Sequence, residues 1–253
     1  MIAGTVSFTL FLIAFVIVYY YYADHVRKGR PFNIRKIPGL DAIGEAIGRC
    51  TEMGRPVHYT FGTDVFGANH LASFEVLSYT AAMCARVGTD IIATTSKPEI
   101  TPIVEEIIRS AYVKEGKAEN FKPDNVRFMS SEQTAYIQGI HGIFMRERPA
   151  ANLMLGAFHA ESLQLSEVGQ QIGAIQIGGT GRTIQIPFFV ATCDYVLIGD
   201  ELFAAGAYIT RQPGQVGGLF AQDFGKWVTI AVVIIGTLMT TMGVKTLTDL
   251  MKK

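Results

Sequence analysis

The feature that most constrains this chain is an uncharged apolar run near its start. Residues 2–23 contain no Asp, Glu, Lys or Arg and include four consecutive tyrosines, Tyr19 to Tyr22, just before Ala23. As a helix rising about 1.5 Å per residue, this run is long enough to cross a hydrocarbon core of about 30 Å. Tyrosine rings suit the boundary between lipid and water. Because no basic residue precedes the run and no small-residue cleavage site follows it, we expect a retained transmembrane helix.

A second uncharged run, residues 227–244, lies between Lys226 and Lys245. It is at the short end of the range for a spanning helix, and Trp227 would anchor it at the interface. Glycine and threonine recur in it, and such residues allow transmembrane helices to approach closely and to hydrogen-bond. The alternative is a lipid-facing helix whose threonine hydroxyls bond to their own backbone.

The distribution of basic residues sets the expected orientation. Five cations follow the first run: Arg27, Lys28, Arg30, Arg35 and Lys36. Lys and Arg concentrate on the cytoplasmic flanks of membrane spans. We therefore expect a protein of the cell (inner) membrane with two spans, with the lipid bilayer as a partner and the main domain in the cytoplasm. The expected organisation is a transmembrane helix at 1–23, a basic juxtamembrane segment at 24–36, an α/β domain at 37–211, a Gly-rich connector at 212–225, and a transmembrane helix with a short tail at 226–253.

Charge and cysteine content exclude several classes of function. The 22 basic residues are balanced by 22 acidic residues, so the chain has no net positive field to attract nucleic acid, and nucleic-acid binding is not expected. Cys50, Cys84 and Cys193 are widely spaced and form no Cys-x-x-Cys pair. This pattern predicts neither a disulfide framework nor a metal site.

Short apolar runs alternate with helical patterns through the middle of the chain. The runs predicted to be strands are residues 55–61, 90–95, 125–129, 152–155, 174–177 and 195–198. Continuous apolar strands that alternate with helices favour a parallel sheet covered on both faces. We therefore expect an open, doubly wound, mostly parallel α/β sheet of the Rossmann-like class. Residues 183–193 are compatible with a strand or with a helix opened by Pro187, and we favour the helix.

In such sheets, ligands bind beyond the carboxyl ends of the strands. The candidate site residues in the loops expected there are Asp64, Thr95, Ser96, Ser131, His159, Glu161, Gly178, Gly179, Thr180, Gly181, Asp200 and Glu201. Loops rich in Gly, Ser and Thr expose backbone N–H groups and hydroxyls to a ligand. The alternative is that these residues are the turn and cap residues that every strand–helix connection needs.

The individual motifs are less specific. The run Gly178-Gly-Thr-Gly-Arg-Thr183 resembles a phosphate-binding loop, but it lacks the Gly-Lys-Ser/Thr ending of a P-loop, so a tight turn is favoured. His159 and Glu161 could pair a base with a carboxylate or supply two metal ligands, but spacing fixes no third ligand. A helix cap beside a solvated histidine is the favoured interpretation. The sequence thus assigns no catalytic residue and no cofactor.

Three stretches, Gly54–Gly62, Ala93–Glu99 and Cys193–Glu201, resemble an uncharacterised family of prokaryotic membrane-anchored proteins of unknown function. The resemblance covers most of the chain and implies no activity. Two hypotheses remain open. The first is a structural or scaffold subunit of a homo-oligomer or of a larger membrane complex. The second is a membrane-tethered enzyme or sensor that binds a small ligand, for example a phosphorylated one, at the carboxyl ends of the strands.

Overall fold

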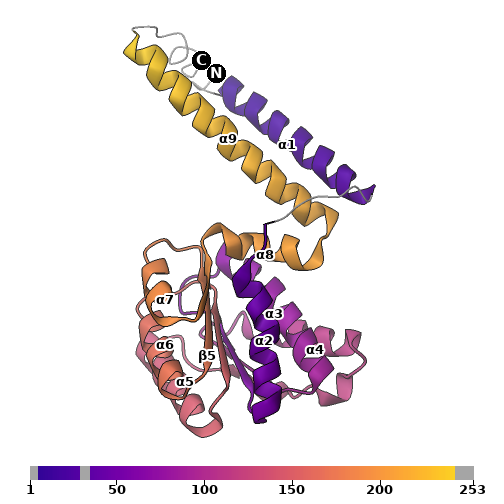
Figure 1. Cartoon of the computed structure of the whole chain (residues 1–253), viewed down its shortest axis with the longest axis vertical. Coiled ribbons are helices and arrows are strands. Elements are labelled where there is room, and N and C mark those ends of the chain that lie inside the picture. Colours follow the sequence, from indigo (N-terminus) through magenta and orange to yellow (C-terminus); the bar gives the residue numbers. More distant parts are fainter. Residues whose placement is uncertain (1–4, 29–34, 243–253) are drawn as a thin grey trace. The chain divides into compact units, whose positions relative to one another are not determined.

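The computed structural model describes residues 5–28 and 35–242 (Figure 1). The chain divides into two units, which we describe separately. The α/β unit is Arg35–Ile209, and the helix unit contains the two long helices α1 (Thr5–Arg27) and α9 (Pro213–Thr241).

The α/β unit is built on a six-stranded sheet in which all neighbouring strands are parallel. The strands are β1 (Val57–Thr60), β2 (Ile91–Thr95), β3 (Val126–Phe128), β4 (Ala151–Leu155), β5 (Ile175–Thr180) and β6 (Tyr195–Ile198). Their order is β3-β2-β1-β4-β5-β6, so the winding direction reverses between β1 and β4. This is the order of doubly wound dinucleotide-binding folds. The predicted parallel α/β sheet is therefore confirmed.

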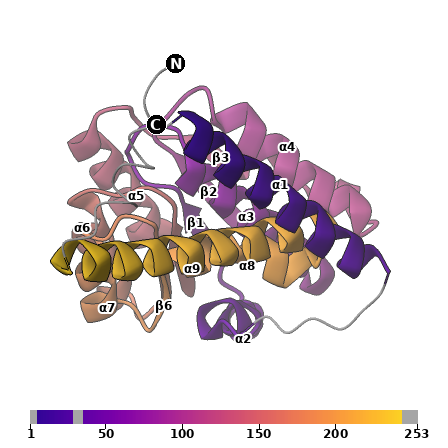
Figure 2. The same cartoon turned by 90° about the horizontal axis from the view of Figure 1, so that it is seen from above.

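Helices cover both faces of the sheet (Figure 2). One layer contains α2 (Pro38–Met53), α3 (Ala68–Val87), α4 (Thr101–Lys114) and α8 (Asp200–Thr210). The other layer contains α5 (Gln133–Glu147), α6 (Glu161–Gln171) and α7 (Ile186–Thr192). Two 3₁₀ turns, η1 (Ala118–Asn120) and η2 (Pro123–Asn125), precede β3. Successive strand residues alternate between the layers, because Ile91 and Ala93 pack in the first core and Ile92 in the second. Burial on both faces explains why the strands are rich in apolar residues.

Helix α7 confirms the helical interpretation of residues 183–193. The glycine-rich run before it differs from expectation, because Gly178, Gly179 and Thr180 lie inside β5 and the loop starts at Gly181. A Cβ atom on Gly178 would lie 2.5 Å from the Phe189 ring, and one on Gly179 would lie 2.7 Å from Leu155 Cδ2. These glycines therefore allow close packing on both faces of β5 and do not form a phosphate-binding turn.

In the helix unit, α1 and α9 pack against each other and run antiparallel. Gly225 of α9 lies near Phe11 and Phe15, whereas Gly217, earlier in α9, lies near Tyr19 and Ala23. A Cβ atom on Gly217 would lie 2.9 Å from the Tyr19 carbonyl oxygen. Residues 212–225 were expected to be a connector, but they are helical from Pro213 onward. Proline suits the first turn of a helix, and the glycines of this segment allow α1 to approach closely.

Among the described residues, α9 is the one helix that length and composition qualify to cross a membrane, with a mean hydropathy of 1.6. Its threonine hydroxyls donate to carbonyls four residues earlier. The four pairs are Thr229 with Gly225, Thr237 with Val233, Thr240 with Gly236, and Thr241 with Thr237. The threonine hydroxyls thus bond to their own backbone, as the second alternative expects, and α9 also packs against α1, as the first expects.

Candidate functional site

The loops that follow β1 and β4 meet at the carboxyl edge of the sheet, where the winding direction reverses. Ala157 donates its N–H to the Phe61 carbonyl at 2.9 Å, and Asp64 donates its N–H to the Ala157 carbonyl at 3.2 Å. Gly62 is essential to this approach, because its φ is +85° and a Cβ atom would lie 2.1 Å from the Ala157 oxygen. Backbone contacts therefore join the two loops at the position where related sheets leave a ligand crevice.

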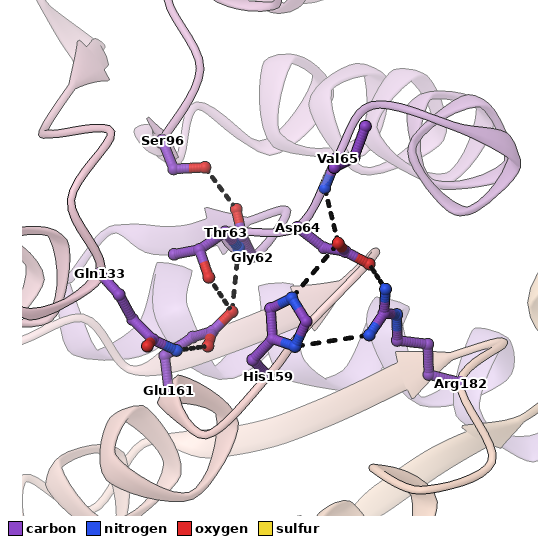
Figure 3. A network of polar contacts seen from close by, with 9 residues as sticks. All are labelled: Gly62, Thr63, Asp64, Val65, Ser96, Gln133, His159, Glu161 and Arg182. Atoms are coloured by element: carbon purple, nitrogen blue, oxygen red, sulfur yellow. Dashed lines mark hydrogen bonds and ion pairs between the residues drawn. The ribbon is translucent and has the colours of Figure 1, made fainter.

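At this edge of the sheet, three polar contacts connect the side chains of Asp64, His159 and Arg182 in a triangle (Figure 3). Asp64 Oδ1 lies 3.2 Å from His159 Nε2, and its other oxygen forms an ion pair with Arg182. Arg182 Nη1 lies 3.4 Å from His159 Nδ1. The side chains of His159 and Arg182 are 45% and 43% exposed, whereas that of Asp64 is nearly covered.

The ionised form of the Asp64 carboxyl is stabilised by its hydrogen-bond and ion-pair partners. Burial by itself raises the pKa of this carboxyl, but the Val65 N–H, the Arg182 guanidinium and His159 together outweigh burial and leave the pKa below its ordinary value. Asp64 therefore stays ionised at neutral pH and neutralises Arg182.

Glu161 is fully buried and forms a second cluster with the half-buried Thr63 and Gln133. Its carboxylate accepts the N–H of Thr63 at 2.9 Å, the hydroxyl of Thr63 at 2.8 Å, and the side-chain amide of Gln133. Ser96 adds a further tie by donating to the Gly62 carbonyl at 2.6 Å. These hydrogen bonds thus connect the loops that follow β1, β2 and β4 with the start of α5 (Figure 3).

The remaining sequence-predicted residues serve mainly as local supports. Thr95 bonds to Thr101, the Thr180 hydroxyl accepts from the Arg182 N–H, Gly181 donates to Asn69, and Glu201 accepts from the Ile198 N–H. Ser131 lies exposed in the loop between β3 and α5, and Asp200 lies exposed as the first residue of α8. Of the predicted set, the structure brings Asp64, Ser96, His159 and Glu161 into one neighbourhood. Thr95 and Ser96 are both buried, so neither hydroxyl is presented to solvent.

Sequence reasoning missed Arg182, Gln133 and His70. Arg182 was visible only as part of the glycine-rich run, and no local pattern links Gln133 to Glu161. His70 had a detectable signal in hindsight: residues 62–67 keep the Gly-x-Gly-x-x-Gly spacing of a dinucleotide-binding turn, with Asp64 in place of the middle glycine. In dinucleotide-binding folds, the phosphates lie at the N-terminus of the helix that follows this turn. His70 lies in the first turn of α3, the corresponding helix here.

Both ring nitrogens of His159 have a partner, since Asp64 lies against Nε2 and Arg182 lies against Nδ1. No group of three His, Cys, Asp or Glu side chains able to hold a metal ion occurs among the described residues.

Apolar side chains lie exposed around the same edge. They are Val65, Phe66, Leu71, Ile184, Ile198 and Phe203, here called the edge patch. Val65 is 76% exposed and Ile184 is 80% exposed. The parts of the patch are joined at Gly181, because its N–H bonds to Asn69 at the start of α3 and a Cβ atom there would touch the Phe203 ring at the start of α8.

A separate polar row runs through the core of the sheet on four adjacent strands. His58 donates from Nδ1 to Asn152 Oδ1 at 2.8 Å and accepts at Nε2 from the Thr94 hydroxyl at 3.0 Å. Asn152 in turn donates to Gln176 at 3.2 Å. Burial lowers the pKa of His58 to about 4, so its imidazole is neutral at pH 7. This row is a structural element, since all four side chains are buried.

Comparison with known proteins identifies a family but no activity. A family described as a domain of unknown function (DUF6754) matches residues 2–251. No curated protein and no solved structure matches the chain.

Proposed function

The chain belongs to the DUF6754 family, a domain of unknown function, and on that premise we propose that it is a membrane-anchored, non-catalytic subunit that assembles through the carboxyl edge of its sheet. The partners are further copies of the chain or other proteins of a membrane complex.

The anchor in this proposal is the antiparallel pair of α1 and α9, each crossing the bilayer once. Two features support the pairing: the close approach at Gly217 and the stacking of Tyr22 on Phe220, whose ring centroids are 4.7 Å apart. Residues 5–23 of α1 carry no charge, and the cluster of cations that follows suits a cytoplasmic flank. An antiparallel pair of spans returns the chain to its starting side, which leaves the α/β unit in the cytoplasm.

The observation that carries the assembly proposal is the contrast between polar and apolar groups at the carboxyl edge. Asp64, His159 and Arg182 bond to one another there, whereas Val65 and Ile184 of the edge patch remain mostly exposed. An enzyme needs the opposite arrangement, with polar groups free to meet a substrate inside an apolar pocket. Exposed apolar patches with a polar surround are typical of protein contact surfaces.

The test is the mass of the particle extracted with its native lipids, for the wild-type chain and for two variants. The edge variant carries Val65→Glu and Ile184→Glu. The control variant carries Val113→Glu, because Val113 is 56% exposed but lies in the last turn of α4, away from the edge patch. We expect wild type and control to give particles larger than one chain, and the edge variant to give the single chain.

Two results would contradict the proposal. A wild-type particle containing a single chain and no other protein would remove the assembly. An edge variant that keeps the wild-type mass while remaining folded would move the contact elsewhere. Far-UV circular dichroism of the edge variant establishes that its α/β unit is folded.

A further inference from the structure

His70 is the unexplained buried group of the α/β unit. Its side chain is fully buried, and in the described part of the chain its Nδ1 and Nε2 are the only buried side-chain nitrogen or oxygen atoms without a hydrogen-bond partner. Leaving a buried polar group unpaired costs about 1–3 kcal/mol. One explanation for such a group is a further molecule that provides its partner.

The position of His70 indicates what that molecule is. His70 is the third residue of α3, a helix of 20 residues whose N-cap, Gly67, supplies no side-chain hydrogen bond. The ring of Phe66, the residue before that N-cap, lies 5.7 Å from the imidazole, which places the imidazole at the N-terminal end of α3, where the positive end of the helix dipole lies.

Two charged residues from neighbouring loops act on this imidazole. Asp64 follows β1 and Lys97 follows β2, and both affect the charge state of His70 electrostatically. The negative charge of Asp64 is already neutralised by Arg182. Lys97 is only partly exposed, and its ammonium has no ion-pair or hydrogen-bond partner among the residues that the structure describes. The uncompensated charge next to the N-terminus of α3 is therefore positive.

We propose that the N-terminus of α3, together with His70 and Lys97, binds the phosphate group of a small phosphate monoester. The backbone N–H groups, one cation and an imidazole are donors suited to a tetrahedral dianion. A dinucleotide does not fit here, because Asp64 places a carboxylate at the middle position of residues 62–67, where a glycine would admit a pyrophosphate. This site goes beyond the assembly function and does not depend on it.

Binding of a dianion also has a consequence for the proton on His70. Burial, which lowers the pKa of His70, outweighs the raising effect of Asp64, and Lys97 lowers it further. A bound dianion favours the protonated imidazole, so binding takes up a proton and tightens as pH falls from 8 to 6. Phe66, whose ring lies 5.7 Å from that of His70, adds an apolar wall and no charge.

The experiment is a calorimetric titration of the full-length chain in detergent at constant ionic strength. Inorganic phosphate is the first probe. Sulfate is the second, because it remains a dianion from pH 6 to 8 and its pH dependence reports on the protein alone. The variants are Lys97→Ala, His70→Gln and, as the control, Lys114→Ala on the exposed end of α4.

We expect both probes to bind the wild type and the control alike, and Lys97→Ala to weaken binding at least tenfold. We expect sulfate to bind the wild type about tenfold more tightly at pH 6 than at pH 8, and His70→Gln to remove most of this dependence. Equal affinity in wild type and Lys97→Ala, which means an adventitious ion only, would overturn the proposal, as would the absence of binding. If His70→Gln does not fold, Lys97→Ala still decides the outcome.

Discussion

The buried polar row gives the most quantitative prediction, because one histidine links its hydrogen bonds to pH. In the folded chain His58 takes up a proton only near pH 4, whereas in the unfolded chain it does so near 6.5. Between these values the unfolded state binds more protons, so the free energy of unfolding falls as pH decreases. A difference of about 2.5 pKa units corresponds to about 3 kcal/mol of stability lost between pH 7 and pH 4.

The assay is urea denaturation of the detergent-solubilised chain at several pH values, followed by far-UV circular dichroism. His58→Gln is destabilised at pH 7, because glutamine cannot place both a donor and an acceptor as the imidazole does. Its stability must also fall less steeply with acid than that of the wild type, by about 3 kcal/mol over the range. Carboxylates titrate equally in both proteins and cancel in the difference.

The matched control is His141→Gln, which removes a partly exposed imidazole of α5 outside the polar row. It should keep the acid sensitivity attributed to His58. The reasoning is refuted if wild type and His58→Gln lose stability in parallel between pH 7 and pH 4. Nuclear magnetic resonance titration of His58 in the folded chain provides a direct check, with no protonation expected above pH 5.

Three further predictions follow from close contacts. Gly217→Leu separates α1 from α9, because a Cβ atom would meet the Tyr19 carbonyl at 2.9 Å; spin labels at positions 22 and 220 should move apart, whereas Gly218→Leu, with nothing within 4 Å, should leave their distance unchanged. Gly62→Ala costs more than about 3 kcal/mol, since backbone strain adds to the clash with Ala157, while Gly54→Ala, which has open space, costs about 1 kcal/mol; urea denaturation compares the two. Glu161→Gln costs about 1–3 kcal/mol, because glutamine keeps one acceptor oxygen and presents an NH2 group to a former donor; urea denaturation measures the loss, and unchanged stability would contradict this role.

The sheet was predictable because its physics is local. Strands buried on both faces read as short apolar runs, and glycine favours the left-handed turn that ends a helix, as at Gly54 and Gly88. Prediction failed where glycine had a packing role. In β5 and at the start of α9, glycines that are typical of loops instead admit a neighbouring side chain or helix.

The candidate site was only partly predictable. The rule that ligands bind at the carboxyl ends of parallel strands located Asp64, His159 and Glu161 in one region. It could not pair Asp64 with Arg182, because 118 positions separate them and the ion pair exists only once β1 and β5 lie in the same sheet. Nor could it reveal that these polar groups bond to one another, or that His70 is buried without a partner.

The proposed anchor requires that α1 and α9 cross the membrane as an antiparallel pair with the α/β unit on one side. Sealed membrane vesicles of one orientation test it, with an epitope tag at each end of the chain and a cysteine introduced at the exposed position Glu119 for an impermeant maleimide. We predict that both tags are accessible only from the face opposite to the one from which Glu119→Cys is labelled. Tags on different faces, or both tags on the face where Glu119→Cys is labelled, would contradict it.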